Sequence, residues 1–217
     1  MHKKHLWIAL GVGTTALLAG CAALSPKPDY DALTAEMMKS SFRDRGIATV
    51  DRLEQNPANA ACSKAAGAEL PPATAKAIEA ANLKTVKMPS DGQFIGDWKA
   101  GEKLAQNGRG MTWNEKSTAT SANGGNCYNC HQIGKAELSF GTIGPSLYQY
   151  GKLRGVSDPQ SAASRPIVEY TWAKLYNSKA FIACSDMPRF GHAGLLDEAQ
   201  LKNVMALLLD PKSPVNQ

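Results

Sequence analysis

The chain has 217 residues, with 24 Lys and Arg against 19 Asp and Glu, which gives a formal net charge of +5 at pH 7. So mild a positive charge gives no case for nucleic-acid binding, which needs a dense stripe of Lys and Arg. The length suits one domain with an extension or two small domains, and the sequence contains no internal repeat.

Residues 1–20 are predicted to be an export signal. Lys3 and Lys4 make the start of the chain positive, and the apolar stretch Leu6–Leu18 is too short to cross a membrane. Removal of the signal would take away these two lysines and no acidic residue, which lowers the formal charge to +3.

The signal ends in Leu18-Ala19-Gly20-Cys21, which resembles the lipobox of bacterial lipoproteins. The resemblance implies cleavage before Cys21, acylation of that cysteine, and a lipid anchor on the periplasmic side of a membrane. Buried acyl CH₂ groups hold a protein there without a transmembrane helix. The residue after Cys21 is Ala22 and not Asp, which resembles the sorting signal of lipoproteins that go to the outer membrane. The alternative is an ordinary secretory signal cut near Ala19 or Ala23.

Residues 21–89 are predicted to form a tether followed by a helical extension. Asp31 is a candidate cap for a first short helix. Residues 44–70 are rich in alanine and are expected to hold one or two short helices. Pro71-Pro72 favours a further helix over 73–81, because proline is well tolerated in the first turn.

The turn-rich residues 87–92 mark a boundary, so we place the second domain at 90–217. Its predicted helices cover Gly96–Gln106, Pro166–Tyr176 and about Asp197–Leu209. The last of them is followed by a proline and has apolar residues at helical spacing, at Leu201, Val204, Met205 and Leu208. All the predicted elements are helices, so the fold class is all-α.

Cys127-Tyr128-Asn129-Cys130-His131 has the C-x-x-C-H pattern by which c-type haem is attached. Cys127 and Cys130 would form thioethers with the two haem vinyl groups, and His131 would be the proximal iron ligand. A redox dithiol would need a thioredoxin-like βαβ context, which the surrounding sequence lacks. A zinc site would need two more nearby ligands, and the only nearby histidine is His131 itself. We therefore expect one covalent haem c.

The second axial ligand of the iron has two candidates. Met187 lies in Met187-Pro188-Arg189-Phe190-Gly191, a loop whose proline and glycine favour extended chain, and we prefer it to His192. Met205 belongs to the apolar stripe of the last helix and is expected in the core. A Met/His pair raises the reduction potential and saturates the iron, which suits electron transfer rather than ligand binding.

The order of these elements is similar to class I cytochromes c, so we expect that fold over residues 90–217, behind the N-terminal helical extension. In that family the loop after the haem motif supplies a proline carbonyl that accepts the proximal histidine's N–H. Gly144-Pro145-Ser146-Leu147 resembles that loop, which gives Pro145 this role. An ordinary Gly-Pro turn is the alternative.

A narrower resemblance is to the X subunits of the sulfur-oxidising SoxAX cytochrome complexes. It is carried by five strings: Gly96-Asp97-Trp98-Lys99-Ala100-Gly101-Glu102, Asn123-Gly124-Gly125-Asn126-Cys127, Gly141-Thr142-Ile143-Gly144-Pro145-Ser146-Leu147, Met187-Pro188-Arg189-Phe190-Gly191 and Leu207-Leu208-Leu209-Asp210-Pro211-Lys212-Ser213-Pro214-Val215-Asn216. The lipobox departs from most of these relatives, which look freely soluble.

This resemblance implies a heterodimer with a SoxA-type cytochrome subunit. Such a complex oxidatively couples thiosulfate to a cysteine of the SoxYZ carrier protein, and the X subunit passes the electrons to a small electron acceptor without being catalytic alone. No residue of this chain matches the sulfur-handling cysteine of the A subunit. Two other functions stay open: a stand-alone, lipid-anchored electron shuttle, and a ligand-binding haem sensor.

Two of the five cysteines, Cys62 and Cys184, are left after lipid and haem have taken the others. In an oxidising compartment two such thiols most often form a disulfide. The alternative is that one of them is a free, reactive or iron-ligating thiol. A disulfide would tie the extension to the segment just before Met187.

Overall fold

The computed structural model describes residues 27–217, so the predicted signal and Cys21 lie outside the described residues. The chain divides into two compact units, one ending at Arg43 and the other comprising Asp44–Gln217. The second unit contains both the predicted extension from residue 44 onward and the predicted domain at 90–217. Its described residues form helices and no strand, apart from one isolated bridge between Arg45 and Ala48, which confirms the all-α class.

The described part of the first unit contains helix α2 (Tyr30–Ser41). Its cap is Asp29 and not the predicted Asp31: Asp29 has extended backbone, and its carboxylate accepts a hydrogen bond from the Ala32 N–H at 3.0 Å. Asp31 lies inside the first turn instead. A carboxylate there still favours the helix, because it faces the positive end of the helix dipole.

The second unit begins with the short helix η1 (Val50–Leu53), followed by α3 (Pro57–Ala65) and α4 (Pro72–Leu83). Both α-helices have proline in their first turn, where no intrahelical N–H donor is lost. The side chain of Asn56 caps α3 by accepting from the Asn59 N–H at 2.9 Å. The helices expected before residue 84 are therefore confirmed.

The remaining elements surround the last long helix. They are α5 (Trp98–Gln106), η2 (Thr120–Ala122), η3 (Cys127–Asn129), α6 (Tyr150–Leu153), α7 (Arg165–Tyr176), η4 (Ser178–Ala180), α8 (Glu198–Leu209) and η5 (Pro214–Asn216). The three long helices predicted here are confirmed. Helix α5 begins at Trp98 rather than Gly96 because the Asp97 side chain caps it, accepting from the Lys99 N–H at 2.9 Å.

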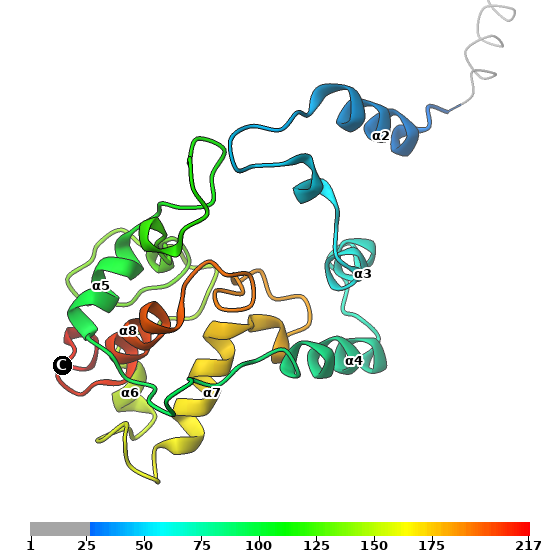
Figure 1. Ribbon diagram of the computed structural model, residues 1–217. Coiled ribbons are helices and arrows are strands. Elements are labelled where there is room, and N and C mark those ends of the chain that lie inside the picture. Colours follow the sequence, from blue (N-terminus) through cyan, green and yellow to red (C-terminus); the bar gives the residue numbers. More distant parts are fainter. Residues whose placement is uncertain (1–26) are drawn as a thin grey trace, which may run out of the picture. The chain divides into compact units, whose positions relative to one another are not determined.

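Helix α8 lies at the centre of the hydrophobic core and packs against α5, α6 and α7 (Figure 1). Its side chains Leu201, Met205 and Leu209 are fully buried, which confirms Met205 as a core residue. Helix α5 comes very close to α8 at Gly101. A Cβ there would lie 2.1 Å from the Asn203 carbonyl oxygen, so only glycine allows this approach.

The extension is fixed to the α7–η4 side of the unit by polar contacts. The amide Nδ2 of Asn177 donates to Asn82 Oδ1 at 3.0 Å and to Thr85 Oγ1 at 2.9 Å. The indole N–H of Trp172, a fully buried residue of α7, donates to the Lys87 carbonyl at 2.8 Å. These bonds satisfy buried donors, so the part of the extension that belongs to the second unit is packed against the rest of that unit.

Candidate haem-binding site

The C-x-x-C-H residues form one tight turn at η3. The carbonyl of Cys127 accepts both the Cys130 N–H at 3.1 Å and the His131 N–H at 2.9 Å. This geometry places the two cysteines and the histidine of the motif within a single turn. The turn follows Asn126, which has a left-handed backbone with φ of 48°.

The glycines before the motif allow the chain to lie against the end of α5. The N–H groups of Gly124, Gly125 and Asn126 donate to the carbonyls of Arg109, Leu104 and Asn107 at 2.8–3.0 Å. A Cβ on Gly124 would lie 1.9 Å from the Asn107 carbonyl oxygen, and one on Gly125 would lie 2.9 Å from the sulfur of Cys127. Gly124 is therefore required by close backbone contact, and Gly125 by the nearby sulfur of Cys127.

Cys127 and Cys130 are both free thiols. Burial raises the pKa of the Cys127 thiol to about 12, so this group is protonated at neutral pH. The reactive thiol of a dithiol oxidoreductase needs a lowered pKa, because the thiolate is the nucleophile. The environment of Cys127 therefore argues against the redox-dithiol alternative.

His131 is buried, and its ring is held from two sides. Its Nδ1 lies 2.7 Å from the Pro145 carbonyl oxygen, which can only accept, so Nδ1 carries the proton and the lone pair of Nε2 is free. The ring also lies directly against Gly144, where a Cβ would come within 2.1 Å of the His131 Cε1 atom. The hydrogen bond expected for Pro145 is thus present, and a glycine before that proline is needed.

Met187 lies in the segment between η4 and α8. Its side chain is half-buried and packs against the hydrophobic core, as does Cys127. The backbone is held at both ends: Ser178 Oγ donates to the Met187 carbonyl at 2.6 Å, and the Met187 N–H donates to Ser185 Oγ at 3.3 Å. The neighbouring Phe190 is buried and its ring comes close to Gly125, beside the motif.

The disulfide predicted between Cys62 and Cys184 is confirmed. The two sulfurs are bonded, across a sequence separation of 122 residues, and the bond connects α3 to the segment that carries Met187. Neither residue is therefore a free or iron-ligating thiol.

His192, the other candidate ligand, is exposed, and its backbone N–H donates to the Tyr176 carbonyl at 2.9 Å. Partial desolvation and the positive charge of Arg189 lower the pKa of its imidazole. This side chain is neutral at pH 7 and lies at the surface of the described structure.

The side chains present fit a covalent haem better than a metal ion held by the chain alone. Within residues 27–217 no group of three or more His, Cys, Asp or Glu side chains is gathered as a metal site. A haem iron needs at most two ligands from the chain, because the porphyrin supplies four nitrogens. Two thiols could attach the porphyrin, and an imidazole with a free Nε2 could bind its iron.

Several residues that shape this site were not identified as such from the sequence. Gly144 is one, although its place before Pro145 was a signal. Asn123 is another: its side chain is buried, Nδ2 donates to the Leu195 carbonyl at 2.8 Å, and Oδ1 has no partner among the described residues. It links the loop before the motif to the segment after Met187, and the Asn-Gly-Gly string was the only sequence signal for it.

No protein-family model matches the chain. The chain is similar to an uncharacterized lipoprotein of Aquifex aeolicus (strain VF5), with 36% identity over 137 residues. The match covers 61% of this chain and 59% of the relative, so the chain spans about three-fifths of that protein's length. Within residues 27–217, no helix is both long enough and apolar enough to cross a membrane. This chain therefore has a lipoprotein homologue.

Proposed function

We propose that this chain is a monohaem c-type cytochrome of class I fold that transfers electrons. Cys127 and Cys130 would hold the haem covalently, His131 would bind the iron on the proximal side, and Met187 on the distal side. The observation that carries the proposal is the His131 imidazole: it follows the two free thiols in one turn, with Nδ1 tied to Pro145 and Nε2 free.

When bound, the haem supplies a one-electron couple at its iron. The chain's own residues would tune and protect that couple. The Pro145 carbonyl holds the proton of His131 at Nδ1 and orients the ring, which increases the basicity of Nε2. Gly144 leaves room for that ring. Saturation of the iron by two side chains would keep small ligands out.

The loop after the motif supports the same proposal. Leu138 is 93% exposed and Ile143 is 78% exposed, and Phe140 between them is also exposed. Three exposed apolar side chains in so short a stretch are unusual for a surface that faces only water. These side chains could pack against an apolar prosthetic group attached at Cys127 and Cys130.

We further propose that the electrons come from sulfur chemistry, with this chain as the X subunit of a SoxAX complex. The coupling R–SH + S₂O₃²⁻ → R–S–S–SO₃⁻ + H⁺ + 2e⁻ takes place on the SoxYZ carrier cysteine at the SoxA-type partner, and this chain would pass the electrons to a small electron acceptor. The support is the set of matching strings, above all Met187–Gly191 and Asp210–Asn216.

Anchoring at Cys21 to a membrane, facing the periplasm and preferably on the outer membrane, completes the proposal. The lipobox supports it, and so does the similarity to a lipoprotein. Mass spectrometry of the mature N-terminus would test it, because a diacylglyceryl group on Cys21 and an ordinary cleaved terminus differ greatly in mass.

Substitution of Met187 tests the iron ligation. Met187→Ala should lower the reduction potential and remove the weak thioether-to-iron band near the red end of the ferric spectrum. His192→Ala is the matched control and should change neither. If the band survives in Met187→Ala while His192→Ala loses low-spin character, His192 is the ligand.

The second candidate function is a lipid-anchored shuttle between respiratory complexes, with which the similarity to a lipoprotein is equally compatible. Purified alone, the chain should stay oxidised in thiosulfate and be reduced once a SoxA-type subunit and the carrier protein are added. Fast reduction by a respiratory complex, together with failure to co-purify with such a partner, would favour the shuttle.

Carbon monoxide binding to the reduced chain would favour a sensor.

A further inference from the structure

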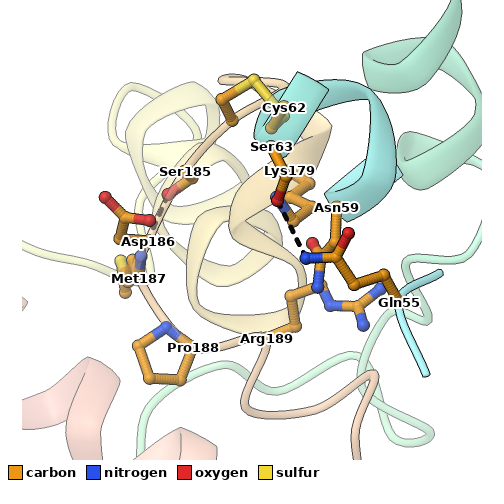
Figure 2. Close-up of a pocket in the computed structure, with 11 residues that line it drawn as sticks. Gln55, Asn59, Cys62, Ser63, Lys179, Ser185, Asp186, Met187, Pro188 and Arg189 are labelled. Atoms are coloured by element: carbon orange, nitrogen blue, oxygen red, sulfur yellow. Dashed lines mark hydrogen bonds between the residues drawn. A yellow bond between two sulfur atoms is a disulfide. The ribbon is translucent and has the colours of Figure 1, made fainter. Parts of the chain in front are cut away.

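A pocket of about 380 Å³ lies between α3 and the segment around Met187 (Figure 2). Residues 55–63 line one side, and Lys179 with residues 184–189 lines the other. The Cys62–Cys184 disulfide joins the two sides. No step of the proposed electron transfer uses the polar side chains of this pocket, so what it binds is a separate question.

Two cationic side chains line the pocket without an acidic partner. Lys179 is only 7% exposed, and its Nζ donates to the Ala183 carbonyl at 3.1 Å, which leaves two of its N–H groups unused. The guanidinium of Arg189 makes no hydrogen bond or ion pair with any residue of 27–217, nor does Lys179 form an ion pair there. A buried ammonium is ordinarily paired, because desolvation of a charge is costly.

The positive charge of the pocket also shows in how Lys179 titrates. Burial lowers the pKa of its ammonium, and the charge of Arg189 lowers it further. The negative charge of Asp186 raises this pKa, but its effect is smaller than that of burial and that of Arg189. The Asp186 side chain is exposed. Its carboxylate forms no ion pair with Lys179 or Arg189, since it lies more than 4.0 Å from both cationic groups. The repulsion between the two cations is therefore only partly offset by Asp186, which forms an ion pair with neither of them.

Neutral donors face the same space. The side-chain amide of Asn59 comes from α3 and has no partner among the described residues. The hydroxyl of Ser185 accepts from the Met187 N–H, so its own proton remains available to donate. Ser63 is occupied, since its Oγ accepts from Gln55 Nε2 at 2.8 Å, a bond drawn in Figure 2.

We propose that this pocket binds a small oxyanion, with sulfate as its simplest representative. An ammonium, a guanidinium, an amide and a hydroxyl approach from α3, from η4 and from the loop, which suits an ion whose oxygens point in several directions. An acidic side chain of a partner protein is the less suitable occupant, because the buried Lys179 lies below the surface that a partner would touch.

Calorimetric titration of the full chain with sodium sulfate, without reductant, tests the proposal. Sodium chloride at matched ionic strength gives the baseline. We expect saturable binding of one sulfate per chain. Arg189→Gln should weaken it at least tenfold, and Asn59→Asp, which adds a negative charge to the exposed edge of the pocket, should do the same. Arg109→Gln is the matched control, because Arg109 is exposed, lies outside the pocket and should leave the affinity unchanged.

Three results would overturn the proposal: no saturable heat, an equal loss in Arg109→Gln, or unchanged affinity in both pocket variants. Binding of a glutamate-rich peptide with no binding of sulfate would assign the pocket to a protein partner instead. The circular dichroism spectrum and melting temperature of each variant show whether it is folded. Asn59 is exposed and its side chain makes no hydrogen bond with the described residues, so we expect this variant to fold and to stay informative.

Discussion

The two sides of the candidate haem site are held in different ways. The segment from Gly124 to Leu147 is held by residues close to it in the chain: Gly144 N–H donates to the Cys130 carbonyl, and Nδ1 of His131 bonds to Pro145, 14 residues away. The segment around Met187 has local hydrogen bonds with Ser178 and Ser185, but it is also tied to residues far away in the sequence. Its disulfide partner is 122 residues away, and the Ala183 N–H donates to Glu79 of α4.

This difference indicates that residues 44–89 stabilise the segment around Met187. A proximal side closed by local contacts can form early and without the extension, because short loops cost little entropy to close. The Met187 side is joined to α3 and α4, which lie far from it in the sequence. The extension therefore acts as a brace for the Met187 segment, and disturbing it should affect the distal side far more than the proximal one.

The largest effect should come from removing the disulfide. Chain-entropy reasoning for a loop of 122 residues predicts that Cys62→Ser with Cys184→Ser lowers the free energy of unfolding by about 4–5 kcal/mol. Denaturant unfolding of the variant and of the oxidised protein measures this loss. Hydrogen exchange should rise more at residues 184–189 than at 127–131. Equal exchange in both segments would contradict the brace.

A smaller effect is expected on the proximal side from Gly144→Ala. The new Cβ would lie 2.1 Å from the His131 ring, so the imidazole must shift and the Pro145 bond must lengthen. Overpacking of this kind costs about 1–3 kcal/mol. Denaturant unfolding gives the loss, and Gly108→Ala is the control, because its Cβ would come no closer than 3.3 Å to any atom. Equal stability of the two variants would show that the ring is not confined.

The smallest effect concerns another long-range tie, between the segment before α5 and helix α8. Lys202 Nζ lies 2.7 Å from Asp91 and 2.8 Å from Glu198. Hydrogen bonds from Lys202 lower the pKa of both carboxyl groups, while those same carboxylates raise the pKa of Lys202. The ion pairs therefore stabilise the fold above the carboxyl pKa values of the unfolded chain, near 4, and this contribution is lost as pH falls through the lowered folded values.

Lys202→Met should accordingly lower the melting temperature by about 2 °C at pH 7, since exposed ion pairs contribute little. The difference from the unchanged protein should vanish near pH 2, well below both carboxyl pKa values. Thermal melts across this pH range provide the measurement. Lys103→Met, at an exposed position of α5 without an ion pair, should show no such pH dependence.

The sequence alone predicted those parts of the molecule that depend on local chemistry. Helix α8 follows from apolar residues at helical spacing and from the proline after it, and α7 from Pro166 in its first turn. The bond between His131 and Pro145 was implied by the resemblance of Gly144-Pro145-Ser146-Leu147 to the loop after the haem motif of class I cytochromes c, and the structure contains it. The haem, its Met187 ligand and the sulfur-oxidising role stay predictions.

Only the tertiary structure decided what depends on segments far apart in the sequence. The Cys62–Cys184 bond could be proposed by counting cysteines, but its consequence, a brace from α3 onto the Met187 segment, required the packing of the extension. No periodicity or spacing in the sequence indicated that the His131 ring lies against Gly144. None indicated that Lys179, Arg189 and Asn59 line one pocket. Periodicity records which face of an element is buried, whereas the partner of that face is chosen by the packing of the whole chain.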